Sequence, residues 1–187
     1  MKAAIGGRVR VMVSGSAPLS AKTINFLKIC FCCPLQEGYG LTETLAVTAM
    51  DATDHRAGLV GGLSPAVEMK LVDVPDMKYL SSDKPYPRGE ICFRGNSIFK
   101  GYFRQPDKTK EVLDENGWFH TGDIGEIHEG GTLKIIDRKK NIFKLSQGEY
   151  IAPEKLEQAY LKSKYIGQIF IHGEPTQNFI VAFIVPD

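Results

Sequence analysis

The sequence lacks several features that would place it in a specialised class of protein. No apolar run approaches the roughly 18–20 residues needed to cross a bilayer, and the longest covers residues 179–185. The formal net charge of +1 gives no basic surface for non-specific nucleic-acid binding, so we expect no nucleic-acid partner. The chain has four cysteines, and Cys30, Cys32 and Cys33 crowd together, which is not the pattern of a disulfide framework. We therefore expect a soluble, cytosolic-type protein of one or two domains.

Several common catalytic patterns are also missing. The loop at residues 14–18 has neither the Walker pattern nor a GxGxxG spacing, and Ser14 does not lie in a GxSxG elbow, so a serine hydrolase has no support. The histidines are scattered, and no Cys or His spacing suits a metal site. We interpret the cysteines at 30–33 as packing residues at a helix end.

What is present is the composition of a globular protein, with 43% hydrophobic and 24% charged residues over 187 positions. Alternation of valines over residues 8–13 predicts a strand, and Ser20 is placed to cap a helix that follows. A second strand is expected at 35–39. The first 64 residues therefore predict a partial parallel α/β layer.

From residue 65 onward the pattern changes to short alternating strands, with a hairpin signal at residues 129–131. We expect a small antiparallel β-barrel subdomain over 65–136. Pro153 suits the first position of a helix, and apolar strands follow it. The fold class is thus mixed α/β. We place the domain boundary between 136 and 137, with the start of an α+β domain at 137–187.

The stretch at residues 36–44 carries the residue types of a nucleotide site. Its glycines allow a ligand to approach the backbone, and Tyr39 offers a ring for stacking. Thr42 supplies a hydroxyl for a phosphate, and Glu43 supplies a carboxylate for a hard cation such as Mg²⁺. The alternative is a strand-to-helix turn in which Thr42 only caps the next helix.

Three further stretches are candidates for ligand binding. The small-residue loop at 14–18 follows a strand, where open α/β sheets gather ligands, although an ordinary tight turn explains it as well. Asp123, in the stretch 117–123, could accept bonds from both hydroxyls of a ribose or form an Asx turn. The basic run at 137–140, with Lys144 close behind, fits either a polyanionic ligand or a solvated face.

In combination and in this order, these stretches resemble the adenylate-forming acyl-CoA synthetases, and within them the long-chain fatty acid–CoA ligases. The motifs are GSAPL at 15–19, EGYGLTE at 37–43, GWFHTGD at 117–123, LKIIDRKKN at 133–141 and FKLSQGEYIAPEK at 143–155. The resemblance implies that a fatty acid and Mg·ATP give an acyl-adenylate and pyrophosphate. Coenzyme A then forms the thioester and releases AMP.

The resemblance also implies roles for individual residues. The adenine would be bordered by Gly15, Ser16 and Ala17 on one side and by Glu37, Gly38 and Tyr39 on the other. Thr42 would bond the α-phosphate and Glu43 would ligate Mg²⁺, which makes these two the catalytic candidates. Asp123 would take the ribose hydroxyls with help from Arg138.

The remaining implied roles concern the last fifty residues. Lys140 matches the family's hinge, about which the small domain swings between the two half-reactions. Lys144 and Gly148 would then approach coenzyme A. Residues 1–136 would be the later part of the large AMP-binding domain.

The same resemblance predicts an incomplete enzyme. The phosphate-binding loop is expected before Met1 and the catalytic lysine of the small domain after Asp187, so we expect the isolated chain to be inactive. The alternative is a stand-alone, catalytically inactive nucleotide-binding or interaction module. A third hypothesis keeps adenylation but changes the acceptor, as in peptide synthetase or luciferase relatives. For the parent enzyme we expect the cytoplasmic side of the cell and peripheral association with an organelle membrane such as the endoplasmic reticulum.

Overall fold

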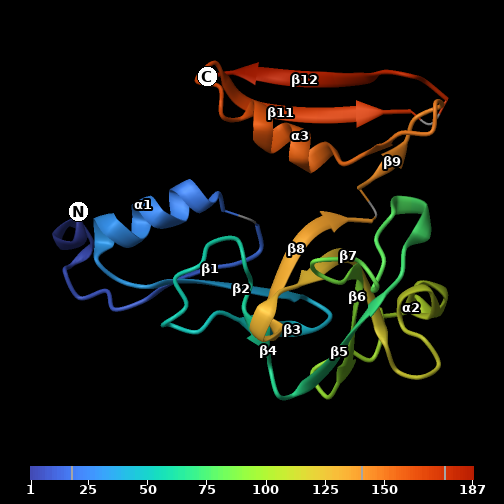
Figure 1. Cartoon of the computed structure of the whole chain (residues 1–187), viewed down its shortest axis with the longest axis horizontal. Coiled ribbons are helices and arrows are strands. Elements are labelled where there is room, and N and C mark those ends of the chain that lie inside the picture. The colour runs from blue at the N-terminus through green and yellow to red at the C-terminus, as the bar shows by residue number, and fades with distance from the viewer. Residues whose placement is uncertain (18, 140, 175) are drawn as a thin grey trace. The chain divides into compact units, whose positions relative to one another are not determined.

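The computed structural model describes residues 1–17, 19–139, 141–174 and 176–187. These residues form two compact units, Met1–Ile136 and Asp137–Asp187 (Figure 1). The strands of the first unit are β1 Met12–Ser14, β2 Leu35–Leu41, β3 Leu45–Ala49, β4 Gly62–Leu63, β5 Val67–Val72, β6 Arg88–Gly95, β7 Phe119–Ile127 and β8 Leu133–Arg138, whose last two residues lie in the second unit. Its helices are α1 Ala21–Phe31 and α2 Pro106–Val112, with 3₁₀ turns at Lys2–Ile5, Pro75–Met77 and Glu129–Gly131. The mixed α/β class predicted from the sequence is confirmed.

The first sheet has the strand order β1-β2-β3-β4 and is parallel only between β1 and β2, where Met12 lies opposite Leu35. The chain turns back sharply after Leu41, so β2 and β3 pair antiparallel, and β4 pairs antiparallel with β3 after a longer loop. The strand expected over residues 8–13 is shorter than predicted and begins at Met12. The layer is therefore parallel at one edge and antiparallel beyond it.

Helix α1 crosses beside β2 and begins where the sequence predicted. The backbone N–H of Thr23 donates to the side chain of Ser20 at 3.1 Å, which satisfies one of the unpaired donors of the first helical turn. Ile24 is buried, whereas Phe26 and Ile29 on the same helix are exposed. The helix thus packs one narrow stripe against the unit and leaves apolar side chains in solvent.

The second sheet has the order β5-β6-β7-β8, and its printed pairs, β5 with β6 and β6 with β7, are antiparallel. The predicted hairpin joins β7 to β8, with the N–H of His128 donating to the carbonyl of Thr132 at 2.8 Å. A bridge between Gly61 and Leu133 connects this sheet to the segment before β4. The two sheets share one core, built on Val47, Val67, Ile91, Phe93 and Leu133.

The single tryptophan lies on the outer surface of the second sheet. The ammonium of Lys70 is 4.4 Å from the centre of the Trp118 ring, and the guanidinium of Arg94 is 4.6 Å from it. Arg94 in turn pairs with Glu68 at 2.5 Å. Two cations thus contact one indole ring, an arrangement that the negative face of the ring favours.

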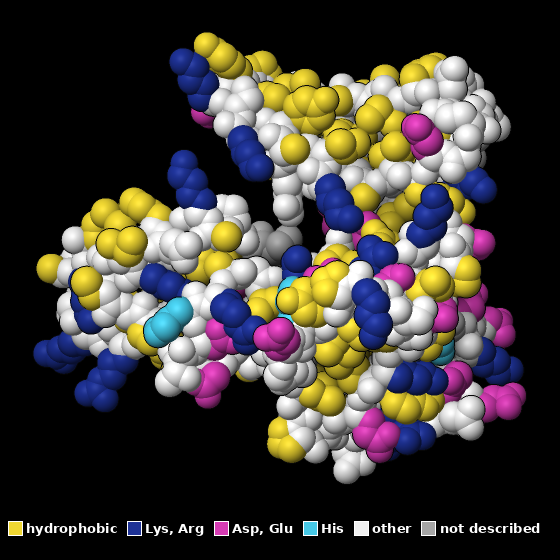
Figure 2. Space-filling model, viewed as in Figure 1, with side chains coloured by type: hydrophobic (Ala, Val, Ile, Leu, Met, Phe, Trp, Pro, Cys, Tyr) yellow, Lys and Arg dark blue, Asp and Glu magenta, His cyan; other side chains and the backbone are white. Residues whose placement is uncertain are grey.

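The second unit contains β9 Phe143–Lys144, β10 Tyr150–Ile151, α3 Pro153–Tyr160, β11 Ile166–Gly173 and β12 Ile180–Pro186. Pro153 opens α3 as predicted, and Glu157 of this helix accepts the N–H of Ile171 at 2.8 Å. Strands β11 and β12 pair antiparallel, and every residue of β12 is exposed. Figure 2 shows hydrophobic side chains gathered over this strand pair. Among the described residues, no helix is both long enough and apolar enough to cross a membrane.

Candidate functional site

The loop after β1 lies beside the predicted adenine stretch of β2. Ser14 is the parallel partner of Glu37, so residues 15–17 follow β1 at the edge where 37–39 run. A Cβ added to Gly15 would lie 3.7 Å from the carbonyl oxygen of Gly38, which is ordinary contact distance. Ser16 adopts a φ of 68°, and Ala17 is exposed. The structure therefore brings together two stretches that the sequence predicted separately.

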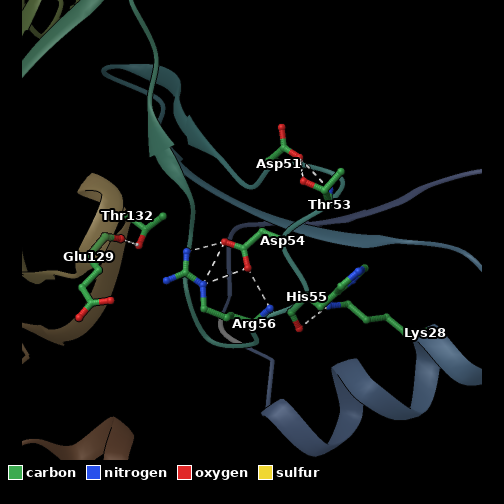
Figure 3. A network of polar contacts seen from close by, with 8 residues as sticks. All are labelled: Lys28, Asp51, Thr53, Asp54, His55, Arg56, Glu129 and Thr132. Carbon is green, nitrogen blue, oxygen red and sulfur yellow. Dashed lines mark hydrogen bonds and ion pairs between the residues drawn. The ribbon is translucent and has the colours of Figure 1, made fainter.

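Glu37 is buried, with 7% of its surface exposed, and its Oε2 accepts the N–H of Gly58 at 2.9 Å. The loop that leads to Gly58 is held by its own polar contacts (Figure 3). Arg56 pairs with Asp54 at 2.6 Å, and hydrogen bonds from Arg56 lower the pKa of Asp54 to about 2. Lys28 of α1 donates to the carbonyl of His55 at 3.3 Å. These contacts fix the loop that holds the Glu37 carboxylate.

Tyr39 and Asp123, predicted for the two halves of an adenosine, are in direct contact. The Tyr39 hydroxyl donates to Oδ2 of Asp123 at 2.5 Å, across 84 positions of sequence. Asp123 is 3% exposed, and its backbone N–H donates to the hydroxyl of Thr121 at 3.0 Å. Since Asp123 lies on β7 and Tyr39 on β2, one hydrogen bond joins the two sheets at the candidate site.

Thr42 and Glu43 lie in the tight turn between β2 and β3, so the alternative in which Thr42 caps a following helix is wrong. Thr42 is exposed and Glu43 is partly exposed. A Cβ on Gly40 would lie 1.9 Å from the carbonyl oxygen of Leu45, so the hairpin closes this tightly only with glycine there. The hydroxyl of Thr44 accepts the N–H of Leu41 at 3.0 Å and fixes the turn.

Tyr102, which no sequence motif indicated, contacts a candidate catalytic residue. Its hydroxyl donates to Oε1 of Glu43 at 2.7 Å, and the N–H of Phe99 donates to the Glu43 carbonyl at 2.8 Å. Burial, followed by the bond to Glu43, raises the pKa of Tyr102 to about 12. Tyr102 is 59 positions from Glu43, and no local spacing marks the pair.

The other predicted site residues belong to the second unit. Lys144 and Gly148 share the short hairpin of β9 and β10, where Gly148 has a φ of 92° and its added Cβ would lie 3.9 Å from Cε of Lys144. The Lys144 ammonium lies 5.2 Å from the centre of the Tyr150 ring. Arg138 is exposed near the start of the unit. The predicted hinge, Lys140, lies outside the described residues.

Comparisons with known proteins identify the family of the chain. The profile of the family described as AMP-binding enzyme matches residues 1–103. Long chain acyl-CoA synthetase 7, peroxisomal, of Arabidopsis thaliana is 57% identical over 188 residues, which cover 100% of this chain and 27% of that protein. Long-chain-fatty-acid–CoA ligase 1 of Homo sapiens is 50% identical over the same share of the chain and 26% of its own length. The chain thus spans about a quarter of these relatives.

Solved structures give the same result. The A domain of carboxylic acid reductase from Segniliparus rugosus, in complex with AMP and a co-purified carboxylic acid, superposes with a TM-score of 0.82 at 39% identity. The match covers 98% of this chain and 28% of that one. The resemblance to adenylate-forming acyl-CoA synthetases that the motifs predicted is confirmed. The chain belongs to the AMP-binding enzyme family.

Proposed function

We propose that this chain is part of a long-chain fatty acid–CoA ligase. The reaction would join a fatty acid to the α-phosphate of ATP, release pyrophosphate, and pass the acyl group to the thiol of coenzyme A with loss of AMP. The observation that carries the proposal is the Tyr39–Asp123 hydrogen bond, because it brings the predicted adenine and ribose stretches together. The names of the similar plant and human proteins support a long-chain fatty acid as the substrate class.

The adenosine part of ATP would be held by the two sheets of the first unit. The adenine would lie between the loop at residues 15–17 and the backbone of residues 37–39, which lie side by side at the end of β1. The Asp123 carboxylate would accept hydrogen bonds from the ribose hydroxyls. Because Asp123 is buried, its bonds would be less weakened by water than those of an exposed carboxylate.

The α-phosphate of ATP and its Mg²⁺ ion would be held by the turn between β2 and β3. Thr42 is exposed there and would donate its hydroxyl to the α-phosphate. The Glu43 carboxylate offers the hard oxygen ligand that Mg²⁺ prefers, and Tyr102 fixes its orientation through one oxygen. When bound, Mg²⁺ supplies positive charge that offsets the phosphate charge. The residues present therefore fit the ion.

For the second unit we infer a role on the coenzyme A side. Lys144 and Gly148 lie in one hairpin, so a cation and an exposed backbone turn are presented together. Such a pair suits the phosphate groups of coenzyme A. The rotation about Lys140 and the ribose contact of Arg138 stay predictions of the family resemblance.

The deciding experiment is fatty-acid-dependent ATP–pyrophosphate exchange, measured in the full-length protein that carries this chain. We expect exchange with long-chain acids and its loss in Glu43→Ala. Glu68→Gln is the matched control: it replaces a carboxylate on the outer surface of the second sheet and should keep the exchange activity. Asp123→Asn should raise the KM for ATP by roughly 10–100-fold, since a charged acceptor is lost. Absence of exchange with every fatty acid would overturn the proposal.

Calorimetry with AMP separates this proposal from the alternative module. A full-length protein that binds AMP without exchange would favour a stand-alone nucleotide-binding protein. We also infer that the ligase acts at the cytoplasmic face of an organelle membrane, because a long-chain acid partitions into lipid. Cell fractionation, with and without a salt wash, tests that location.

A further inference from the structure

Three potential metal ligands meet on neighbouring strands of the second sheet. Glu90 and Cys92 lie on β6, and His120 lies on β7 as the direct cross-strand partner of Cys92. The Sγ of Cys92 is 3.3 Å from Nδ1 of His120, and that nitrogen is 3.6 Å from Oε2 of Glu90. All three ligand atoms lie within 4.8 Å of one another. Local spacing could not reveal the group, because the register between β6 and β7 creates it.

We propose that Glu90, Cys92 and His120 form a binding site for a divalent transition-metal ion of the zinc class. Thiolate sulfur, imidazole nitrogen and carboxylate oxygen are the usual zinc ligands, with bonds of about 2.0–2.3 Å. In a tetrahedral site such bonds separate the ligand atoms by about 3.4–3.6 Å. The measured 3.3 and 3.6 Å are within a few tenths of an ångström of those values.

The other nitrogen of the imidazole faces a carboxylate. Nε2 of His120 is 3.8 Å from Oδ2 of Asp114. The opposite oxygen of Asp114 accepts the N–H groups of Asn116 and Trp118, both at 2.9 Å, so the carboxylate is fixed in place. A histidine that ligates a metal characteristically donates its second N–H to a carboxylate or carbonyl, which sets the tautomer. Asp114 faces that nitrogen at 3.8 Å, which is longer than a hydrogen bond, so it would take this role after a small movement toward His120.

Burial and ligand type determine which ion the site favours. Cys92 is fully buried and Glu90 is 5% exposed, whereas His120 is partly exposed, so an ion would enter from the histidine side. One oxygen of Glu90, Oε1, accepts the N–H of Gly122 at 3.2 Å, and the other, Oε2, is the one that faces Nδ1 of His120 at 3.6 Å. A thiolate ligand favours Zn²⁺ or Co²⁺ over Mg²⁺. The site therefore differs in chemistry from the one proposed at Glu43.

Binding would release the thiol proton of Cys92 to the buffer, because the thiolate is the form that ligates the metal. The bound ion would join β6 to β7 three residues before Asp123. Metal occupancy would thus brace the strand that carries the candidate ribose ligand. The inference rests on the geometry of β6 and β7 and does not depend on the proposed ligase activity.

The test is a titration of the reduced chain with Co²⁺, followed by absorption spectroscopy. We expect a thiolate-to-cobalt charge-transfer band together with the intense visible bands of a tetrahedral ion. Cys92→Ser should lose the charge-transfer band. Cys33→Ser removes a buried cysteine between α1 and β2, away from the second sheet, and should keep the band. A band that persists in Cys92→Ser would come from another cysteine and would overturn the assignment.

Three further variants, one of them a control, keep the test decisive if Cys92→Ser fails to fold. His120→Gln alters a partly exposed residue and should also abolish the tetrahedral spectrum, whereas His128→Gln, in the turn between β7 and β8, is the matched control. Asp114→Asn should weaken Co²⁺ affinity by roughly 10–100-fold while leaving the shape of the spectrum unchanged. A folded wild-type chain that shows no charge-transfer band at saturating Co²⁺ would refute the site.

Discussion

The candidate site contains the same chemical contact twice, in two different settings. Tyr39 donates to Asp123 at 2.5 Å and Tyr102 donates to Glu43 at 2.7 Å. The first pair joins the two sheets at a carboxylate that is 3% exposed. The second joins a hairpin turn to the segment before α2, at a carboxylate that stays partly exposed.

The difference follows from where each carboxylate lies in the chain. Asp123 lies in a run of five buried residues, 121–125, beside a register shift between β6 and β7, and its backbone N–H is held by the hydroxyl of Thr121. Glu43 lies at a turn, and the turn geometry depends on Gly40 and on the positive φ of Leu45. A buried pair fixes the distance between elements, whereas a pair at a turn orients one side chain toward solvent. We expect stability to depend mainly on the first pair and ligand chemistry mainly on the second.

The largest loss of stability is expected from a substitution that opens the hairpin between β2 and β3. Gly40→Ala would place a Cβ 1.9 Å from the Leu45 carbonyl oxygen, so the hairpin must open at a cost of about 3 kcal/mol in the free energy of unfolding. Urea denaturation of the chain measures this loss. Gly15→Ala is the control, since its Cβ would make an ordinary contact at 3.7 Å. Equal losses for both variants would contradict the assigned role of the turn.

Smaller losses of stability are expected when the hydroxyl group of each tyrosine is removed in a separate variant. Tyr39→Phe removes one hydrogen bond from a buried carboxylate and should cost about 2 kcal/mol. Tyr102→Phe should cost only about 0.5 kcal/mol, because water can reach Glu43 and replace the bond. Both are read from denaturation midpoints at neutral pH. If the two losses were the same, burial would not distinguish the pairs.

The smallest effect is a dependence of stability on pH that comes from the pair of Tyr102 and Glu43. The pKa of Tyr102 is raised from 10.0 to about 12, chiefly by burial, so the folded chain holds this proton more tightly than the unfolded chain. The resulting stability is fully present below pH 10 and is lost as the pH rises toward 12. The difference in unfolding free energy between the wild type and Tyr102→Phe should therefore shrink over this window. A constant difference would rule out this linkage.

Local features of the fold could be predicted from the sequence. The Ser20 cap, the hairpin at residues 129–131 and the Pro153 helix start depend on residues close together in the chain, and all three are present. The extent of β1 was predicted less well, since its pairing with β2 decides where it begins. The sequence left open whether a helix begins at Thr42, because turn residues alone do not specify the element that follows. In the structure that element is β3.

The candidate site was predictable as a set of residues but not as a set of contacts. Tyr39 and Asp123 were named from their motifs, whereas their hydrogen bond depends on how two sheets pack. Tyr102 and the pairing of Cys92 with His120 were missed for the same reason. Each partner lies 28 or more positions from the other, so only tertiary structure brings them together.

The two cations that contact Trp118 give this protein a built-in optical reporter. It is the only tryptophan in the sequence, so the indole emission comes from one place on the second sheet. Lys70 and Arg94 reach it from β5 and β6, and Trp118 itself lies two residues before His120. Any event that shifts these strands will change the charge around one fluorophore. Its emission can therefore follow folding without an added label, and it gives a second test of the proposed cobalt and nucleotide binding.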